Sequence, residues 1–478
     1  MDNSFAASMN LGFGFRPDES IPDDIKSWAK SQLTGGVDKL GVSSHGSQAV
    51  EPWPSRYDLS LNDRVKSLQT LRSKKEKLWR DKKYSDSQIA VKVNDLYNEY
   101  DPRRYDELKL IHSSIYSTNQ VRQRFVNFWA NHFTVGGHVA YSDGLIGHYI
   151  ENAIDGSILG SFDELLYKVT THPAMLIYLD NVFNIGPRSK KAKECRNCQV
   201  GLNDNLGREL LELHTLSPIA GYTESDINGI ARILAGWGVL LDDLKNKETR
   251  QISNHWDAYV SYHAEPGSKK VLGRSYSAGK RSLRKLTNYL SSRSETRSNL
   301  ASKLCRHFVS DPPRKEDVVK VVKVWDESNG NLVAIHEAVI DLVVSNKSSK
   351  FNWPYTWLMQ VNRISGANFF IGWQDVAAKG SNGARPHETL IELGQSFWAI
   401  RQPNGYSDRA SDWVSAEHME RRIRFADAVF NLGKPIVSPE EIAVRMGLSA
   451  QTVSLISSFS SKRQQFVALT CSSEFMGV

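Results

Sequence analysis

Apolar residues recur at helical spacing along most of this chain. In the stretch 119–134 the apolar stripe occupies positions i, i+4, i+7, i+8 and i+11, which are Val121, Phe125, Phe128, Trp129 and His132. The same period predicts helices over 22–34, 61–82, 86–116, 145–155, 161–171, 173–181, 203–217 and 223–236. It returns over 280–291, 295–308, 314–327, 330–345, 354–363, 386–398, 415–431 and from Ser438 onward. The pattern therefore predicts a mainly α protein.

The stretch 238–275 interrupts the helical period. Residues 254–263, NHWDAYVSYH, are rich in aromatic and β-branched side chains, which favours a short strand or hairpin. No internal repeat and no long linker divides the chain. We therefore expect a lead-in over 1–20 and a large single multi-helix domain over 21–478, with a small β-hairpin insertion near 238–275.

Length and composition fit a soluble globular protein, because 40% of the 478 residues are hydrophobic and 24% are charged. No run of about 18 apolar residues occurs, so we expect no membrane-spanning helix. The start, MDNSFAASMNLGFGFRPDES, lacks a basic segment followed by an apolar one, so we see no signal peptide and predict a cytoplasmic location.

The net charge of +7 is spread unevenly. Between Lys269 and Arg306 there are eleven Lys or Arg residues against one acid, Glu295. Such a stretch can attract an anionic ligand, and it can equally be the solvated face of helices. Because no nucleic-acid-binding signature accompanies the charge, we do not expect nucleic acid as a partner.

Several common sites lose their sequence support. The chain has no phosphate-binding G-x-x-x-x-G-K-[ST], no G-x-S-x-G and no H-E-x-x-H. Cys195 and Cys198 form a lone C-x-x-C in a basic polar stretch, without the second pair that a zinc ribbon needs. The sequence leaves the metal and the cofactor, if any, unknown.

The densest polar stretch lies in 203–214. On a helical wheel one face carries Asn205, Arg208, Glu209 and Glu212, and the opposite face is apolar with His214. Two carboxylates three positions apart can share a metal or divide the roles of acid and base, and an adjacent Arg can orient one of them or bind an anion. The alternative is that this face simply lies in water.

Three further residues are candidates. His132 lies among aromatic residues, either as a core histidine or as a site residue whose pKa is lowered by burial. Asp180 lies near a helix C-terminus, where the helix dipole is unfavourable, so it needs a partner such as Arg208 or Arg232. Arg232, in an apolar helix that ends at Gly236, is either a structural clamp or an anion ligand.

Strings along nearly the whole chain resemble one bacterial family, domain of unknown function 1800. The clear strings are FWANHF (128–133), HPAMLIYLDN (172–181), LNDNLGRELLELHTL (202–216), YTESDINGIARILAGW (222–237) and SKLCRHFVSDPP (302–313). Weaker ones are LGFGFRP (11–17), LGQSFWAIRQPNGY (393–406) and ALTCSSEF (468–475). Three departures are Asp204 in place of the usual Glu, Ala235 in place of the usual Thr, and a segment after His263 that is one residue longer.

The resemblance implies a mostly helical bacterial protein without an established reaction. Members are often encoded beside a second family that resembles sulfatases, which suggests a protein partner, and many appear exported. Because the polar face of 203–216 belongs to the strongest string, the resemblance favours a buried polar cluster over a solvated face. The expected members are Asn205, Arg208, Glu209, Glu212, Asp180, Arg232 and His132.

Two functional hypotheses follow. In the first, the protein is a hydrolase or transferase with Glu209 or Glu212 as general base, Arg208 or Arg232 holding an anionic group, and His132 as acid or metal ligand. The further binding residues in this hypothesis are Asn205, Asp180, Trp237 and His263. In the second, the protein is a non-catalytic scaffold or accessory protein, and the charged residues form a structural network.

Overall fold

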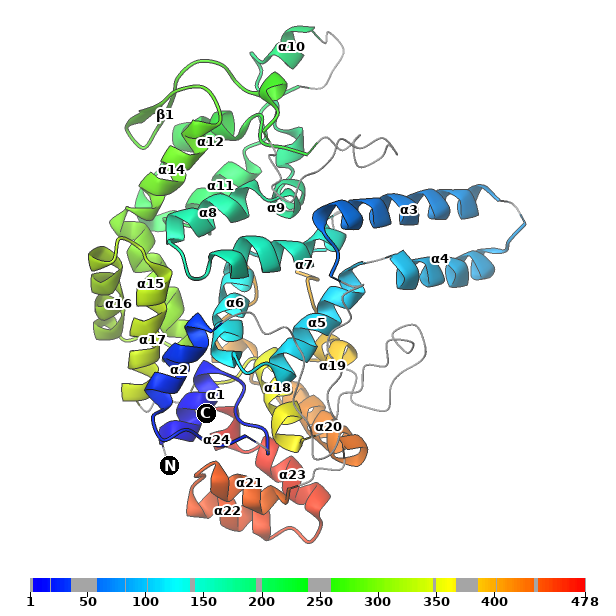
Figure 1. The fold of residues 1–478 in the computed structure, drawn as a ribbon, viewed down its shortest axis with the longest axis vertical. Helices are drawn as coiled ribbons and strands as arrows, with labels where there is room; N and C mark the ends of the chain where they lie inside the picture. Colours follow the sequence, from blue (N-terminus) through cyan, green and yellow to red (C-terminus); the bar gives the residue numbers. More distant parts are fainter. Residues whose placement is uncertain are drawn as a thin grey trace.

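The computed structural model describes residues 3–17, 19–35, 58–81, 83–100, 102–137, 142–194, 200–239, 259–346, 350–366, 386–400, 402–433 and 437–477. Helices dominate these residues and form a body that is longer than it is wide (Figure 1). The mainly α prediction is confirmed. Cys195 and Cys198 lie outside the described residues.

The N-terminal helices pack into the body. They are α1 (Asn3–Leu11) and α2 (Ile25–Thr34), which contact each other as well as α6 (Gln120–His132) and α17 (Leu332–Asn346). The stretch 1–20, expected as a lead-in, thus contributes a helix, and Leu11 and Phe13 are fully buried. Helix α2 begins after Asp24, whose side chain accepts hydrogen bonds from the backbone N–H groups of Lys26 and Ser27.

A pair of antiparallel helices projects from the body (Figure 1). They are α3 (Leu61–Arg80), which Ser60 caps, and α4 (Asp86–Tyr100). Where the sequence predicted one helix over 86–116, a second helix, α5 (Pro102–Tyr116), begins at Pro102. Proline suits this first helical position because its missing N–H has no partner there in any helix.

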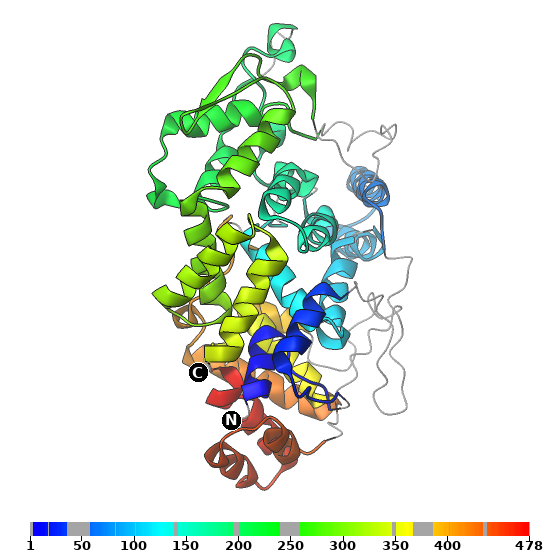
Figure 2. The same cartoon turned by 60° about the vertical axis from the view of Figure 1, so that its left-hand side comes forward.

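The middle of the chain builds one end of the long axis, and the last helices build the other (Figures 1 and 2). The middle elements are α7 (Ile146–His148), α8 (Phe162–Thr171), α9 (Pro173–Tyr178), α10 (Lys190–Glu194), α11 (Asn205–Glu212), α12 (Glu224–Leu234) and α14 (Arg281–Ser291). Then follow α15 (Ser294–Phe308), α16 (Lys315–Glu327), α17, α18 (Pro354–Ser365), α19 (Pro386–Glu392) and α20 (Ala416–Gly433). The last are α21 (Pro439–Arg445), α22 (Ala450–Ser457), α23 (Lys462–Thr470) and α24 (Ser473–Met476).

The small β-hairpin expected near 238–275 is confirmed, and it lies after the aromatic stretch 254–263. Strand β1 (Lys269–Val271) pairs antiparallel with β2 (Arg274–Tyr276), and β1 packs on α12. The turn is Leu272-Gly273, both with positive φ (47° and 77°), as a tight two-residue hairpin turn requires. Residues 254–258 lie outside the described residues, and Ser261–His263 forms a 3-10 turn.

Buried apolar side chains form two clusters. The first cluster lies between α6, α8, α11, α12, α14, α15, α16 and α17 and includes Phe125, Trp129 and Leu304. The second cluster lies between the N-terminal residues, α18 and the helices α20–α24, and it includes Phe13, Trp357 and Phe466. Within the described residues, no helix is both long and apolar enough to cross a membrane.

Candidate functional site

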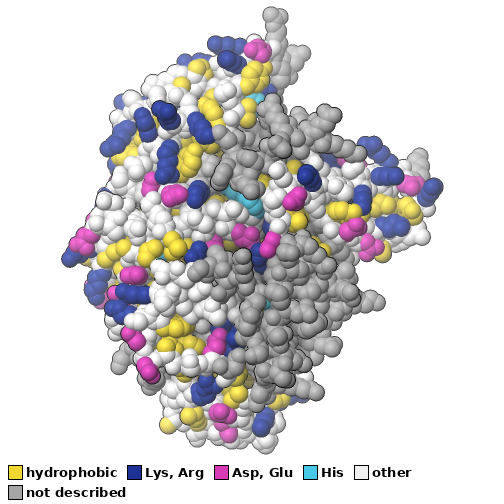
Figure 3. Space-filling model, viewed as in Figure 1, with side chains coloured by type: hydrophobic (Ala, Val, Ile, Leu, Met, Phe, Trp, Pro, Cys, Tyr) yellow, Lys and Arg dark blue, Asp and Glu magenta, His cyan; other side chains and the backbone are white. Residues whose placement is uncertain are grey.

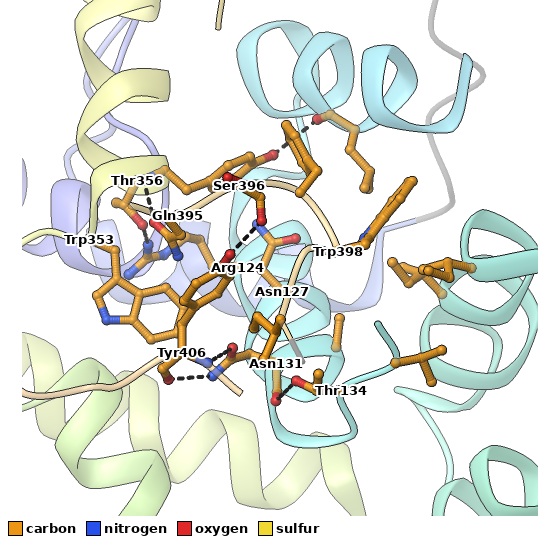
Figure 4. Close-up of a pocket in the computed structure, with 18 of the residues that line it drawn as sticks. Arg124, Asn127, Asn131, Thr134, Trp353, Thr356, Gln395, Ser396, Trp398 and Tyr406 are labelled. Atoms are coloured by element: carbon orange, nitrogen blue, oxygen red, sulfur yellow. Dashed lines mark hydrogen bonds between the residues drawn. The ribbon is translucent and has the colours of Figure 1, made fainter. Parts of the chain in front are cut away.

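The structure has a central cavity with a volume of about 120 Å³, lined by residues from both apolar clusters (Figure 4). Its walls come from α5, α6, residues 146–150, α15, α18 and the segment 395–406. Most of the wall is apolar and aromatic. A few polar side chains reach into it, which is the usual composition of a small-molecule site.

Helix α6 supplies one polar wall. Arg124, Asn127 and Asn131 are spaced by three and four residues and therefore share one face. The neighbouring face, with Phe125 and Trp129, is buried in the first apolar cluster. The apolar pattern thus predicted the face of α6 that is buried in the core. The cavity lies against the adjacent face, which carries Arg124, Asn127 and Asn131.

Arg124 is buried, with 6% of its surface exposed. One terminal nitrogen donates to Thr356 Oγ1 and the other to the backbone carbonyl of Asn10 at 3.2 Å, and Nε has no acceptor. No carboxylate of the described residues forms an ion pair with it. Burial lowers the pKa of Arg124 to about 10, against the attraction of Asp408, so the guanidinium is still charged at neutral pH.

His307, on α15, forms a pair with Asp408. The ring atom Nδ1 lies 2.6 Å from Asp408 Oδ1, and the ring packs edge-on against Trp353 and Phe308. Burial lowers the pKa of His307, and Asp408 opposes this, so the ring is neutral at neutral pH. Within the described residues Nε2 has no hydrogen-bond partner, and His307 is part of the cavity wall.

Cations outnumber carboxylates beside this pair. The pKa of His307 is affected by Arg124, Lys350 and Asp408. The pKa of Lys303 is affected by Arg306 and Asp408, and that of Lys350 by Arg306, Asp408 and Asp311. The group thus contains four cations, one of which, Arg124, is itself affected by Asp408, and two carboxylates. Burial lowers the pKa of Lys303 to about 8, which Arg306 assists and Asp408 opposes. This corner of the structure therefore favours a bound anion.

The segment 395–406 is fastened to α6. Asn131 donates to the carbonyl of Tyr406 at 3.0 Å and accepts from the Tyr406 N–H at 2.7 Å. Trp398 has φ of 47°, which is rare for a bulky residue, and its carbonyl accepts from the Gly137 N–H at 2.6 Å. Such strained backbone is concentrated at functional sites.

The polar face of α11 does not form the expected buried cluster. Arg208, whose side chain is 35% exposed, pairs with Glu224 at 2.9 Å, Asp204 at 3.2 Å and Glu212 at 3.6 Å. The reason is that α11 lies against α12, and the start of α12 brings Glu224 over the polar face. The inward orientation predicted for this arginine was wrong.

Glu209, Asn205 and Asp180 are all partly exposed. Partial burial raises the pKa of Glu209, and the charge of Glu212 adds to this while Arg208 opposes it. The backbone N–H of Asn205 donates to Asn203 Oδ1 at 3.0 Å. Asp180 has a left-handed backbone (φ 56°), and neither Arg208 nor Arg232 pairs with it within the described residues.

Arg232 belongs to a second ionic group, which is centred on Glu265. The Glu265 carboxylate is fully buried and accepts from Arg232 at 2.8 Å and from Arg188 at 2.7 Å. Burial would raise its pKa, but the hydrogen bonds and charges of Arg188 and Arg232 outweigh this and lower it. Of the two alternatives for Arg232, these contacts favour the structural clamp, and no pattern in the sequence pointed to Glu265.

His132 belongs to a third group. Its Nε2 lies 3.2 Å from the carbonyl of His214, and its Nδ1 lies 3.4 Å from Nζ of Lys303, which also donates to the Leu213 carbonyl. Burial, assisted by Lys303 and His214, lowers the pKa of His132 well below its ordinary value. The seven residues expected as one cluster therefore do not come together, and none of them lines the central cavity.

Several polar residues in or next to the family strings join helices and turns by hydrogen bonds. Asn181 donates to the carbonyl of Trp237 and Asn184 donates to that of Ala231, so the turn after α9 is tied to the end of α12. Trp237 itself is buried. The carbonyl of His263 accepts from the backbone N–H of Gly186 at 2.9 Å. These polar residues thus hold helices and turns together.

Several cavity residues lie in the family strings, although none of them was predicted as a site residue. Asn131 lies in FWANHF, His307 in SKLCRHFVSDPP, and Trp398 and Tyr406 in LGQSFWAIRQPNGY. The three strings are far apart in the sequence and meet at this one cavity. Arg124 is outside all of them and carried no signal besides its place on α6.

Basic side chains of 269–306 gather on the surface over α14 and the hairpin (Figure 3), while other residues of the stretch, such as Lys269 and Leu283, are buried. Several of its arginines are paired, including Arg284 with Asp163 at 3.3 Å and Arg293 with Glu295. Within the described ranges, no three His, Cys, Asp or Glu side chains gather as metal ligands would.

Comparison with known families identifies a matching family. The model of a family described as "Protein of unknown function (DUF1800)" matches residues 7–476, nearly the whole chain. No curated protein and no solved structure matches the chain.

Proposed function

The chain belongs to the DUF1800 family of proteins of unknown function, and we propose that it is a hydrolase or transferase that acts on a small substrate in the central cavity. The observation that supports this best is the hydrogen-bonded pair of His307 and Asp408 in the cavity wall. The reaction class is the one that the sequence suggested, with other residues in the catalytic roles.

The pair has the arrangement of a general base with its orienting carboxylate. Asp408 accepts the Nδ1–H of His307 and so leaves the lone pair on Nε2. Nε2 takes the proton from a water (hydrolase) or from the hydroxyl of a second substrate (transferase) as that oxygen attacks. The same proton then passes to the leaving group. A ring that is neutral at neutral pH suits this role.

Diethyl pyrocarbonate, which acylates neutral imidazole, tests whether His307 is a reachable base. Peptide mass spectrometry reports modification at each histidine. We expect His307 to be modified through the cavity, and the fully buried His214 and His336 to be protected in the same sample. The variant Ala130→Phe, which fills the cavity from α6, should slow the modification of His307.

An unreactive His307 in a sample whose partly exposed His263 and His418 are fully modified would contradict the proposal. That result would favour the scaffold hypothesis, in which the cavity is a packing defect between two apolar clusters. A partner protein and a cytoplasmic location stay predictions from the sequence.

A carboxylate site on α11 is a second candidate. The raised pKa of Glu209, next to Glu212 and close to the Tyr178 phenol, is the observation that favours it. In this version Glu209 or Glu212 is the base, Arg208 binds the anionic group and His132 acts indirectly. Loss of turnover in Glu209→Gln, with full turnover in His307→Asn, would favour this site over the cavity.

A further inference from the structure

We infer that the substrate is a compact organic monocarboxylate, whose charge is held by Arg124 and whose apolar body fills the central cavity. This inference rests on the proposed function, since it names the substrate class of the same cavity. Three independent features of the cavity support it: the free donors of Arg124, the surplus of positive charge and the size and lining of the space.

The first feature is the hydrogen bonding of Arg124. A guanidinium has five N–H donors, and Arg124 uses two of them, toward Thr356 and Asn10. Each terminal nitrogen keeps a second N–H, and Arg124 is part of the cavity wall. A ligand in the cavity with acceptor oxygens can take these hydrogen bonds, whereas Nε, which has no acceptor, has less than 1 Å² of accessible surface.

The second feature is charge. A buried arginine is normally accompanied by a carboxylate, as Arg64 is by Asp106 at 2.5 Å in this same protein. Arg124 has no such partner within the described residues, and Asp408, the carboxylate whose charge raises its pKa, is already bound to His307. A ligand carboxylate would supply the missing countercharge in the planar geometry that a guanidinium prefers.

The third feature is the space itself. A cavity of about 120 Å³ is similar to the 150 Å³ apolar cavity that holds one benzene molecule. Its apolar walls include Ile146, Tyr355, Phe397 and Trp398. One ring or a short branched chain with a single carboxylate fits this volume. A bare inorganic anion would leave the apolar walls without contact.

Thermal-shift and calorimetric titration with benzoate tests the inference, with inorganic phosphate and neutral benzamide as comparison ligands. We expect benzoate to raise Tm, and phosphate and benzamide to have little effect. Arg124→Met should weaken benzoate binding at least tenfold. The matched control Arg281→Met, which removes an exposed arginine on α14, should leave binding unchanged.

Ala130→Phe gives a second test that does not depend on the folding of the Arg124 variant. It should abolish benzoate binding by filling the cavity while Arg124 remains. Absence of a benzoate shift, equal shifts with phosphate, or unchanged affinity in Arg124→Met would each overturn the inference.

The same titration on His307→Asn separates the two proposals. Retained benzoate binding together with a His307 that diethyl pyrocarbonate does not reach would mean that the carboxylate inference holds and the catalytic role fails. A reactive His307 without benzoate binding would mean the reverse.

Discussion

His307 and Asp408 lie 101 residues apart in the sequence, and their side chains are joined by a 2.6 Å contact between Nδ1 and Oδ1. The contact ties α15, in the first apolar cluster, to the segment that precedes α20, in the second. It also places one histidine of the SKLCRHFVSDPP string at the wall of the cavity that lies between the clusters. This relationship makes the cavity a site at which chemistry can be tested.

Asp408→Asn should lower the pKa of His307 further, because the carboxylate is what opposes the effect of burial. The measurement is an NMR titration of the His307 ring. The control is Asp311→Asn, which removes the same charge from the ion pair with Lys350 without touching His307. Equal pKa changes in both variants would show that net charge, and not the Asp408 contact, controls this histidine.

Arg124→Met should leave the free energy of unfolding unchanged or raise it, because it replaces a buried cation without a carboxylate partner by an apolar side chain of similar length. Arg64→Met is the contrast, since it leaves Asp106 buried and unpaired and should cost about 3–5 kcal/mol. Urea unfolding of both variants gives the comparison. If Arg124→Met lowers the free energy of unfolding as much as Arg64→Met does, Arg124 is a structural residue.

The buried histidines predict a loss of stability in mild acid. Burial lowers the pKa values of His214 and His336 to about 3, below the value of about 6.5 in the unfolded chain. Their contribution to the free energy of unfolding is complete at a pH above the pKa of the unfolded chain. It is lost as the pH falls toward the pKa of the folded protein. At pH 5 each histidine should lower the free energy of unfolding by about 2 kcal/mol relative to its value at pH 7 or above.

The variant His214→Leu tests this directly, because neither ring nitrogen of His214 has a hydrogen-bond partner to lose. Its free energy of unfolding should fall less between pH 7 and pH 5 than that of the unmodified protein. Identical pH dependence in the two proteins would show that His214 does not titrate on unfolding in this range.

Glu265→Gln should destabilise the fold by about 1.5–3 kcal/mol, because the buried side chain loses its charge-assisted hydrogen bonds from Arg188 and Arg232, which stay partly hydrated. Glu224→Gln is the matched control, since Glu224 also binds an arginine through both oxygens but is exposed. That change should cost less than about 1 kcal/mol. Denaturant midpoints of the two variants measure the difference, and equal midpoints would contradict the assigned roles.

Local patterns predicted the helices well and the site poorly. The stripe on 119–134 gave α6, and Ser438 with Pro439 gave the start of α21. The hairpin lies at the end of the expected stretch 238–275, because the Leu272-Gly273 turn, and not the aromatic stretch 254–263, decides its position.

The polar face of α11 shows why the site could not be read from spacing. A helical wheel tells which residues share a face but not which element covers that face, and here α12 brings Glu224 to Arg208. The cavity depends on pairs such as Asn131 and Tyr406, which are 275 residues apart. No pattern within one helix contains such a relationship.

A crystal structure of the protein grown with benzoate tests the central claim most directly. We predict density for the ligand in the central cavity, with its carboxylate within about 3 Å of the Arg124 guanidinium and its ring beside His307. An empty cavity, with benzoate found only at exposed arginines such as Arg274 and Arg281, would contradict the account.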